Sequence, residues 1–326
     1  MAYRLRVAEV IAETAEAHSL VLAVPPELSA TFSYLPGQYL TVLVPHGSGS
    51  VARSYSLSSS PHTDANPKIT IKRVRDGQAS NWLCDHVQAG DELELLPPAG
   101  EFTPGSFDDD LLLLAGGSGI TPVMAIIKSV LAHGHGRLAL VYANRDESSV
   151  IFAGELAELG RRHGDRLRVT HWLDHERGAP DPGALAALVT PWAGLMAYIC
   201  GPEPFVAIAR EALQEAGVPH DRVRVERFAF EQARTADATL EVELDGQTHR
   251  LPWPTGTRML DVVIEAGLNP PFSCRQGHCG ACACRLLSGE VEMINNEILE
   301  EEDFAEGYVL ACQSVARSEH VSVTYY

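Results

Sequence analysis

Hydrophobic and polar residues alternate over roughly the first hundred residues, in short stretches separated by turn-forming residues. The alternating stretches cover residues 4–10, 19–24, 38–44, 54–58, 69–74 and 92–95. Pro36-Gly37 and Gly90-Asp91 mark two of the turns between them. A period of two is typical of strands with one buried face. Residues 1–104 are therefore predicted to form an antiparallel β-barrel.

The pattern changes after residue 110, where Leu111 to Leu114 form a continuous apolar run. Such a run is typical of a strand that is buried on both faces. Further strand patterns at 138–142, 167–172, 197–200 and 223–226 alternate with helical patterns at 123–132, 155–162, 184–188 and 204–216. This alternation predicts an α/β domain with a doubly wound parallel sheet over residues 105–231.

The last third of the chain begins after residues 232–237, which lack an apolar pattern and are predicted to be a linker. Strand patterns at 239–244 and 248–251 then flank Asp245-Gly246, a strong signal for a hairpin. A helical pattern over 257–266 and a strand pattern over 321–325 follow. Residues 238–326 are therefore predicted to be a separate, compact α+β domain.

Four cysteines in this domain have the spacing of metal ligands. Cys274, Cys279 and Cys282 stand at C-x4-C-x2-C, and twenty-nine residues separate Cys282 from Cys312. This is the ligand arrangement of a plant-type [2Fe-2S] cluster. A structural zinc site and buried free thiols are the alternatives, although zinc ribbons favour paired C-x2-C knuckles. Cys284 does not fit the spacing and is interpreted as a bystander.

The barrel carries a candidate flavin site. Arginine binds phosphate through a bidentate fork, a tyrosine ring can pack flat on a flavin, and a helix start can receive a pyrophosphate. In the strand over 54–58, alternation places Arg53 and Tyr55 on one face and Ser56 on the other. Taken alone, such a string is more often part of an ordinary strand. The candidate flavin-binding residues are Arg53, Ser54, Tyr55, Ser56, Lys72, Gly77, Ala79, Ser80 and Asn81.

Glycine turns at the ends of the α/β strands are candidates for binding a nucleotide. Glycines after the first strand allow the backbone to approach a diphosphate, although a purely structural loop is the alternative. Cys200 fits either a nicotinamide site or the core, and Arg145 fits either an adenosine ribose, with or without a 2′-phosphate, or the surface. The candidate residues are Gly116, Gly117, Ser118, Gly119, Thr121, Arg145, Cys200, Gly201 and Pro202.

Charge and cysteine usage narrow the partners and the compartment. The formal charge of −18 disfavours nucleic acid and anionic membranes as partners. Residues 238–326 carry fourteen Asp or Glu against five Lys or Arg, a net of −9, which fits either solubility or steering toward a basic redox partner. No apolar run is long enough to span a membrane and no signal peptide follows Met1, so a cytoplasmic protein is expected.

The three segments together resemble the ferredoxin-NADP reductase superfamily, and in this order its phthalate dioxygenase reductase type. The resemblance covers essentially the whole chain and rests on Arg53-Ser54-Tyr55-Ser56, the glycine loop and the four spaced cysteines. Within the family, Ala143-Asn144-Arg145-Asp146, Cys279-Gly280-Ala281-Cys282 and Leu310-Ala311-Cys312-Gln313 look closest to the reductases of 3-ketosteroid 9α-hydroxylase and phenylacetyl-CoA epoxidase.

This resemblance implies roles for the candidate residues and a β-grasp fold for the ferredoxin domain. Arg53 would bind the flavin phosphate, Tyr55 would pack on the isoalloxazine ring and Ser56 would lie near its reactive nitrogen. Residues 77–81 would receive the pyrophosphate of FAD, which is expected in preference to FMN. The glycine loop, Thr121 and Cys200 match pyridine-nucleotide positions, and Glu226-Arg227-Phe228 looks like the segment that closes the nicotinamide side of the flavin.

The implied function is electron transfer to an oxygenase of the Rieske or di-iron type. NADH, or alternatively NADPH, would give a hydride to FAD, which would reduce the [2Fe-2S] cluster in single-electron steps. No residue is expected to act as a nucleophile or general acid, and Cys200, Ser56 and Glu226 are expected to support the cofactors. The alternatives are a reductase for a cytochrome or another iron–sulfur protein, and a zinc-stabilised binding module.

Overall fold

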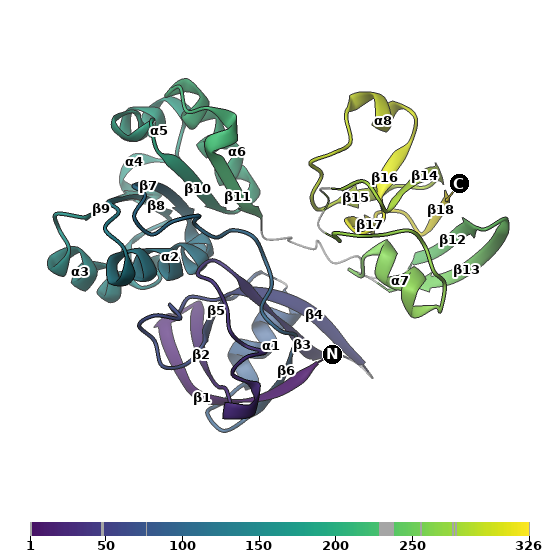
Figure 1. Ribbon diagram of the computed structural model, residues 1–326, viewed down its shortest axis with the longest axis horizontal. Coiled ribbons are helices and arrows are strands. Elements are labelled where there is room, and N and C mark those ends of the chain that lie inside the picture. Colours follow the sequence, from purple (N-terminus) through teal and green to yellow (C-terminus); the bar gives the residue numbers. More distant parts are fainter. Residues whose placement is uncertain are drawn as a thin grey trace. The chain divides into compact units, whose positions relative to one another are not determined.

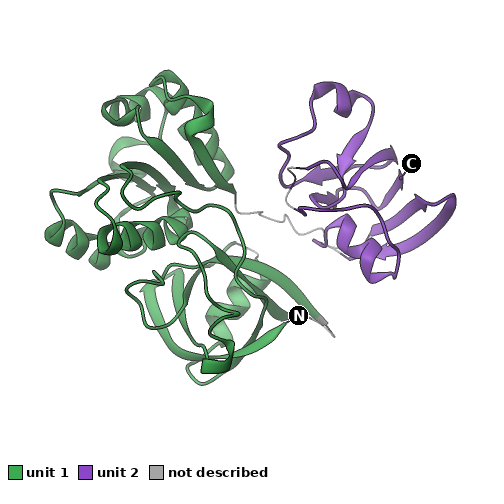
Figure 2. Cartoon of the chain, in the orientation of Figure 1, with its two compact units in different colours: residues 1–228 green, residues 229–326 purple. Residues whose placement is uncertain are grey.

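The computed structural model describes residues 2–46, 49–75, 77–227, 238–254, 256–275, 277 and 279–325. The chain forms two compact units, residues 1–228 and residues 229–326 (Figure 2). The predicted linker 232–237 lies outside the described residues. Among the helices that the structure describes, none combines the length and the apolar character that crossing a bilayer requires.

An antiparallel six-stranded sheet forms the first half of unit 1, in the strand order β4-β3-β6-β1-β2-β5 (Figure 1). An isolated bridge between Leu57, which follows β4, and Ile69 in β5 joins the two edges, so the sheet closes as the predicted barrel. Helix α1 packs against β3 and β5. The elements are β1 (Tyr3–Thr14), β2 (Ala17–Ala23), η1 (Pro26–Leu28), β3 (Tyr39–His46), β4 (Gly49–Ser56), β5 (Lys68–Lys72), α1 (Gln78–His86) and β6 (Glu92–Leu95).

Strand β1 is longer than the sequence pattern predicts. Its pairing with β2 shifts register between Val7 and Glu9 and again between Ala12 and Thr14. A bulge of this kind inserts an extra residue and interrupts the alternation of buried and exposed side chains. The hydrophobic pattern therefore fades before the strand ends.

A five-stranded parallel sheet in the order β11-β10-β7-β8-β9 forms the second half of unit 1. Helices α2 and α3 cover one face, where Leu111 and Leu113 point, and α5 and α6 cover the other, where Leu112 and Leu114 point. The predicted doubly wound sheet is confirmed. The elements are β7 (Leu111–Gly116), η2 (Gly117–Gly119), α2 (Ile120–His133), β8 (Leu138–Asn144), η3 (Glu147–Ser149), α3 (Ala153–Arg162), β9 (Leu167–Leu173), α4 (Asp174–Arg177), α5 (Pro182–Val189), η4 (Thr190–Trp192), β10 (Met196–Gly201), α6 (Glu203–Glu215), η5 (His220–Arg222) and β11 (Val223–Arg227).

Unit 2 contains a mixed five-stranded sheet in the order β13-β12-β18-β14-β16 and a two-stranded sheet of β15 and β17. Asp245 and Gly246 both have positive φ angles, 53° and 73°, as the predicted two-residue hairpin turn requires. The elements are β12 (Ala238–Leu244), β13 (Gln247–Trp253), α7 (Met259–Glu265), β14 (Ala283–Ser288), β15 (Val291–Met293), α8 (Glu301–Ala305), β16 (Tyr308–Leu310), β17 (Ser314–Ala316) and β18 (His320–Thr324).

A buried ammonium group joins the barrel to the parallel sheet within unit 1. Lys128 on α2 is 8% exposed, and its Nζ lies 2.8 Å from a carboxylate oxygen of Asp64 and 2.8 Å from one of Glu155. Burial lowers the pKa of Lys128, but its bonds to the two carboxylates outweigh this and raise it overall. Ser60 and Ser129 add a buried hydroxyl contact of 2.8 Å between the same elements. The charges therefore fix how the two halves of the unit meet.

Replacing Lys128 with methionine should destabilise unit 1 by about 3 kcal/mol, because it leaves the partly buried Asp64 carboxylate without its counter-ion and leaves Glu155 with only the Lys68 ammonium, at 3.7 Å. Thermal or urea denaturation monitored by circular dichroism measures this loss. Arg137→Gln is the matched control, since it breaks an exposed ion pair with Asp110 inside one half and should change stability much less. Equal denaturation midpoints for Lys128→Met and the parent chain would contradict the assigned role.

Candidate functional site

Strand β4 presents the candidate flavin residues in the predicted alternation. Tyr55 pairs with Leu40 of β3 and Arg53 pairs with Val42, so both side chains lie on the face of these two buried residues. Burial raises the pKa of Tyr55, so the phenol keeps its proton and offers a neutral ring. Ser56 points to the opposite face and is 3% exposed. Strand β4 thus presents a cation and an aromatic ring together.

Helix α1 begins directly after Gly77, as predicted. Residue 77 must be small, because a Cβ there would lie 2.7 Å from the hydroxyl of Ser80. The Ser80 hydroxyl accepts a hydrogen bond from the amide of Val74, and the Asn81 amide group donates to the Val74 carbonyl. These bonds hold the turn in which the first backbone amides of α1, including that of Ala79, have no partner within the helix. The helix start suits a phosphate group.

The glycines in and beside the loop between β7 and α2 differ in how closely other atoms approach them. A Cβ on Gly119 would lie 2.0 Å from the Cys200 carbonyl oxygen, and Cβ atoms on Gly116 and Gly201 would each lie 2.8 Å from the Phe205 ring. These three glycines therefore allow β7, β10 and α6 to pack closely. Gly117, with φ +52°, is not needed for this packing. A Cβ there would contact only the Lys72 ammonium, at 3.4 Å.

The remaining candidates of this region lie around the same loop. The Thr121 hydroxyl donates to the carbonyl oxygen of Ser118 at 3.0 Å and so closes the first turn of α2. Pro202 precedes α6 and occupies its N-cap position. The loop and the start of α6 thus lie at the carboxyl ends of neighbouring strands, where ligands of doubly wound sheets bind.

A partly buried carboxyl group, that of Glu226, joins the barrel to the parallel sheet. Glu226 at the end of β11 accepts a hydrogen bond from the Ser56 hydroxyl at 3.3 Å and one from the Cys200 thiol at 3.9 Å. Burial raises the pKa of Glu226 to about 8, so this carboxyl is mostly protonated at neutral pH. Burial also raises the pKa of Cys200, which keeps its thiol protonated. Two candidates from distant parts of the sequence, Ser56 and Cys200, thus converge on the carboxyl group of a third, Glu226.

Two candidates lie apart from this convergence or outside the described residues. Arg145 follows β8 and forms an ion pair of 2.6 Å with Glu16 of the barrel. Sequence analysis did not single out Glu16, because the two residues are 129 positions apart and Glu16 lies in an ordinary turn. Phe228 lies outside the described residues.

Three of the four spaced cysteines precede β14, the fourth lies in the turn between β16 and β17, and the four make contacts in two pairs. The Cys274 amide donates to the Cys279 sulfur, and the Cys312 amide donates to the Cys282 sulfur, each at 3.5 Å. The side-chain amide of Gln313 donates both to the Cys312 sulfur and to the Arg275 carbonyl oxygen, which links the pairs. Two pairs of thiolates are what a cluster of two irons needs.

The hydrogen bond between Cys282 and Cys312 favours a thiolate at Cys312. The Cys282 thiol shares its hydrogen with Cys312, and this bond lowers the pKa of Cys312 to about 6 and raises that of Cys282. By contrast, burial raises the pKa of Cys284 to about 12, so this thiol keeps its proton. Gly277 and Gly280 have φ angles of 88° and 68°, which let the loop turn around a small group. The donor set fits a [2Fe-2S] cluster.

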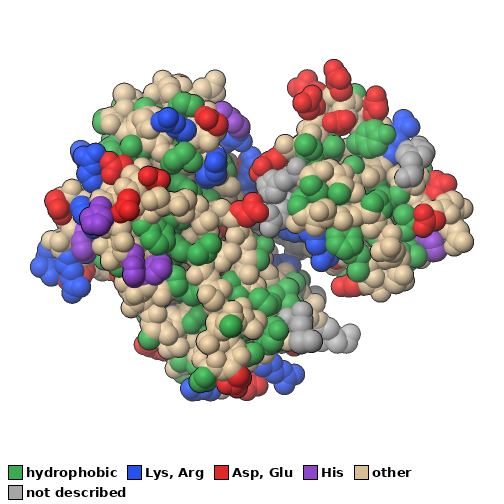
Figure 3. Space-filling view, in the orientation of Figure 1, with side chains coloured by type: hydrophobic (Ala, Val, Ile, Leu, Met, Phe, Trp, Pro, Cys, Tyr) green, Lys and Arg blue, Asp and Glu red, His purple; other side chains and the backbone are tan. Residues whose placement is uncertain are grey.

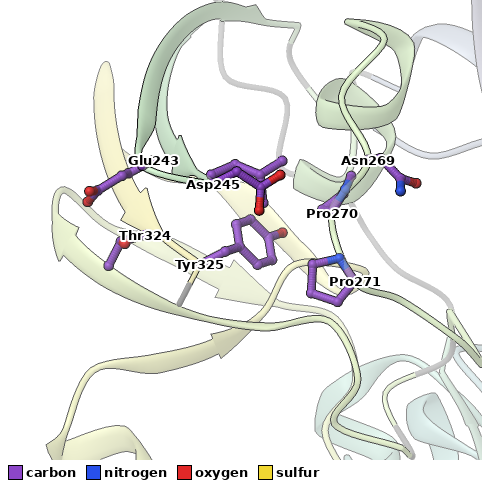
Figure 4. A pocket seen from close by; sticks show the side chains of 9 residues that line it. Glu243, Asp245, Asn269, Pro270, Pro271, Thr324 and Tyr325 are labelled. Atoms are coloured by element: carbon purple, nitrogen blue, oxygen red, sulfur yellow. The ribbon is translucent and has the colours of Figure 1, made fainter.

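A pocket of about 610 Å³ lies elsewhere on unit 2 (Figure 4). Its lining includes Glu243, Asp245, Pro270, Pro271 and Tyr325. None of the described residues that line it is a cysteine, so this pocket is separate from the candidate cluster site.

Three family models match consecutive parts of the chain. The oxidoreductase FAD-binding domain matches residues 4–103, the oxidoreductase NAD-binding domain matches residues 113–211, and the 2Fe-2S iron-sulfur cluster binding domain matches residues 242–317. These matches coincide with the barrel, the parallel sheet and unit 2.

Similar proteins include reductase components of several oxygenases. The ferredoxin reductase component of 3-ketosteroid-9-alpha-monooxygenase from Mycobacterium tuberculosis (strain ATCC 25618 / H37Rv) is 51% identical, over 98% of this chain and 95% of the relative. The corresponding component from Rhodococcus rhodochrous is 47% identical, over 98% and 96%. The chain belongs to this family of reductases. One component of the 1,2-phenylacetyl-CoA epoxidase from Escherichia coli (strain K12) is 29% identical, over 99% and 97%.

The reductase also shares its fold with a solved structure. Phthalate dioxygenase reductase, described as a modular structure for electron transfer from pyridine nucleotides to [2Fe-2S], superposes with a TM-score of 0.70 over 99% of this chain and 98% of that chain, at 24% identity. The expected fold is thereby confirmed. The reductase is an oxidoreductase with domains for FAD, NAD and a [2Fe-2S] cluster.

Proposed function

We propose that this reductase passes electrons from NADH to the oxygenase component of a 3-ketosteroid 9α-monooxygenase. The identities of 47% to 51% to reductase components of that system, over almost the whole chain, support this choice. The structural observation that carries the redox part is the convergence on Glu226. Ser56 from the barrel and Cys200 from the parallel sheet both donate to its carboxyl group, so the proposed flavin and nicotinamide sites would adjoin.

The barrel residues would hold and orient FAD. Arg53 would bind its phosphates together with the first amides of α1 after Gly77, and Tyr55 would pack against the ring system. Ser54, Lys72, Ala79, Ser80 and Asn81 complete the proposed contacts. Bound FAD supplies the chemistry of accepting electrons in pairs from a pyridine nucleotide and releasing them singly.

The loop over 116–119 and Thr121 would position the pyridine-nucleotide diphosphate. At Gly117 the diphosphate could approach the backbone closely. Cys200, Gly201 and Pro202 would lie against the nicotinamide, and Phe228 would close that side of the flavin. The protonated Glu226 carboxyl would hold the Ser56 hydroxyl and the Cys200 thiol in fixed orientations, because each donates to it. The chain would thus bind and orient the cofactors and exclude water from them, while the cofactors carry the electrons.

Cys274, Cys279, Cys282 and Cys312 would hold the [2Fe-2S] cluster. Backbone amides donate to the sulfurs of Cys279 and Cys282, and such bonds stabilise thiolate ligands and tune the reduction potential. Residues 1–104 would form the FAD domain. Residues 105–231 would form the nucleotide domain, and residues 238–326 the ferredoxin domain.

The oxygenase would meet an acidic surface. Acidic side chains gather over α8 of unit 2 (Figure 3), where Glu300, Glu301 and Glu302 are exposed. Such a surface attracts a basic partner and speeds encounter. We place the protein in the cytoplasm, because none of the seven cysteines is paired in a disulfide, as is usual in a reducing compartment.

An anaerobic titration of the purified protein with NADH and then NADPH tests the proposal. Absorbance at the flavin and iron–sulfur bands should fall together, with less NADH than NADPH needed. Bleaching of the flavin alone, with zinc found in place of iron, would remove the cluster from the electron path and overturn the oxygenase assignment.

A further inference from the structure

An ion pair crosses from the barrel to the end of a strand in the parallel sheet. The Arg145 guanidinium lies 2.6 Å from the Glu16 carboxylate, although one follows β8 and the other lies in the turn between β1 and β2. Their side chains are 62% and 46% exposed. Exposed ion pairs contribute little to stability, so the pair is not explained by a need to hold the fold together.

The position of Arg145 is where doubly wound sheets distinguish NAD from NADP. In such sheets the diphosphate lies at the turn after the first strand, and a residue farther along the chain contacts the ribose. An acidic residue there accepts a hydrogen bond from the 2′-hydroxyl, whereas an arginine accommodates a 2′-phosphate. Here β7 is the first strand and Arg145 directly follows the second, β8, so this chain has an arginine at the expected ribose position, and Glu16 neutralises its charge.

The ion pair of Arg145 and Glu16 lies near two further charged residues, Lys72 and Asp146. Three charged neighbours act on Lys72: burial first, then Arg145, lowers the pKa of Lys72, while Glu16 and Asp146 oppose this shift. Two cations and two carboxylates form a group with no net charge. The Glu16 backbone is held in place, because its carbonyl oxygen accepts a hydrogen bond from the Arg73 amide at 2.7 Å. The barrel therefore presents this carboxylate to the ribose position in a defined place.

We propose that Glu16, a residue of the flavin barrel, selects NADH over NADPH by occupying the Arg145 guanidinium at the end of β8. A 2′-phosphate would have to displace the Glu16 carboxylate and then lie beside it, two like charges in contact. A 2′-hydroxyl can instead donate to that carboxylate. The inference rests on the proposed function, because it assumes that the nucleotide binds across the glycine loop and the end of β8.

Steady-state kinetics of the full-length holoenzyme with each nucleotide test this selection. Glu16→Gln should raise kcat/KM for NADPH about tenfold, since a dianionic phosphate no longer meets a carboxylate within a few ångströms. The value for NADH should change about twofold or less, because the amide oxygen of glutamine still accepts a hydrogen bond from the 2′-hydroxyl. The ratio of the two values is the readout.

Two further variants separate the pair from general charge effects. Glu94→Gln removes the same charge from β6 and should leave the ratio unchanged. Arg145→Gln added to Glu16→Gln should cancel the gain, because the two side chains act on the same phosphate. An unchanged ratio in Glu16→Gln, or an equal rise in Glu94→Gln, would overturn the inference. If the parent enzyme oxidises neither nucleotide, the proposed function itself fails.

Discussion

Replacing Cys279 with serine is expected to abolish electron delivery to one-electron acceptors while leaving reduction of the flavin by NADH nearly intact. The Cys279 sulfur is paired with Cys274 and lies in unit 2, whereas the candidate flavin and nucleotide residues lie in unit 1. Outer contacts of metal ligands already cost about 10- to 100-fold when lost, so losing a ligand should cost at least about 100-fold. Stopped-flow flavin reduction and cytochrome c reduction measure the two steps separately.

Cys284→Ala provides the matched control for this experiment. Cys284 is buried two residues after Cys282, and its thiol contacts the Met259 sulfur at 3.8 Å. Because it is not one of the paired thiols, its loss should leave iron and sulfide content and acceptor reduction close to those of the parent. A Cys279→Ser protein in which flavin reduction also stops would show that the order of electron transfer is not the proposed one.

Replacing Glu226 with glutamine should remove a large pH dependence of stability. Burial raises the pKa of Glu226 to about 8 in the folded chain, from an ordinary 4.5. The folded state therefore keeps a proton that the unfolded chain releases, and the stabilisation is full below the ordinary pKa. It is lost as the pH rises through the folded value, by as much as about 4 kcal/mol between about pH 5 and pH 8.

Urea denaturation of the parent and of Glu226→Gln at several pH values measures this difference. The parent should lose stability relative to the variant as the pH rises, because glutamine cannot ionise. Glu211→Gln on α6 is the control, since its side chain is exposed and should leave the slope unchanged. Parallel curves for the parent and Glu226→Gln would mean that the carboxyl group titrates normally in the fold.

The features that the sequence predicts correctly depend on neighbours in the chain. The cysteine spacing, the run Leu111 to Leu114 before a glycine turn, and the Asp245-Gly246 hairpin each arise within a few residues. The barrel sheet, the parallel sheet with its two helix layers, and the first hairpin of unit 2 follow from the period of hydrophobic residues. Resemblance to a family then assigns cofactors to these elements, and the family comparisons agree with that assignment.

The contacts that the sequence does not predict join residues far apart in the chain. Ser56 and Glu226 are 170 positions apart, and Lys128 and Asp64 are 64 positions apart. No local pattern distinguishes Glu16 from other acidic turn residues, because its partner Arg145 belongs to another domain. Such pairings depend on how the barrel packs against the sheet, which the hydrophobic pattern of either part does not specify.

The close packing of the glycine loop also limits how this protein can vary. A side chain at Gly119 would collide with the Cys200 carbonyl oxygen, and side chains at Gly116 and Gly201 would collide with Phe205. Substitutions at these three glycines should prevent correct folding, so any effect on nucleotide binding would not be observed. Gly117 is the loop position where asparagine, which tolerates a positive φ, meets only the flexible end of Lys72. Among the glycines of this loop, position 117 is therefore the one that can change without a steric clash.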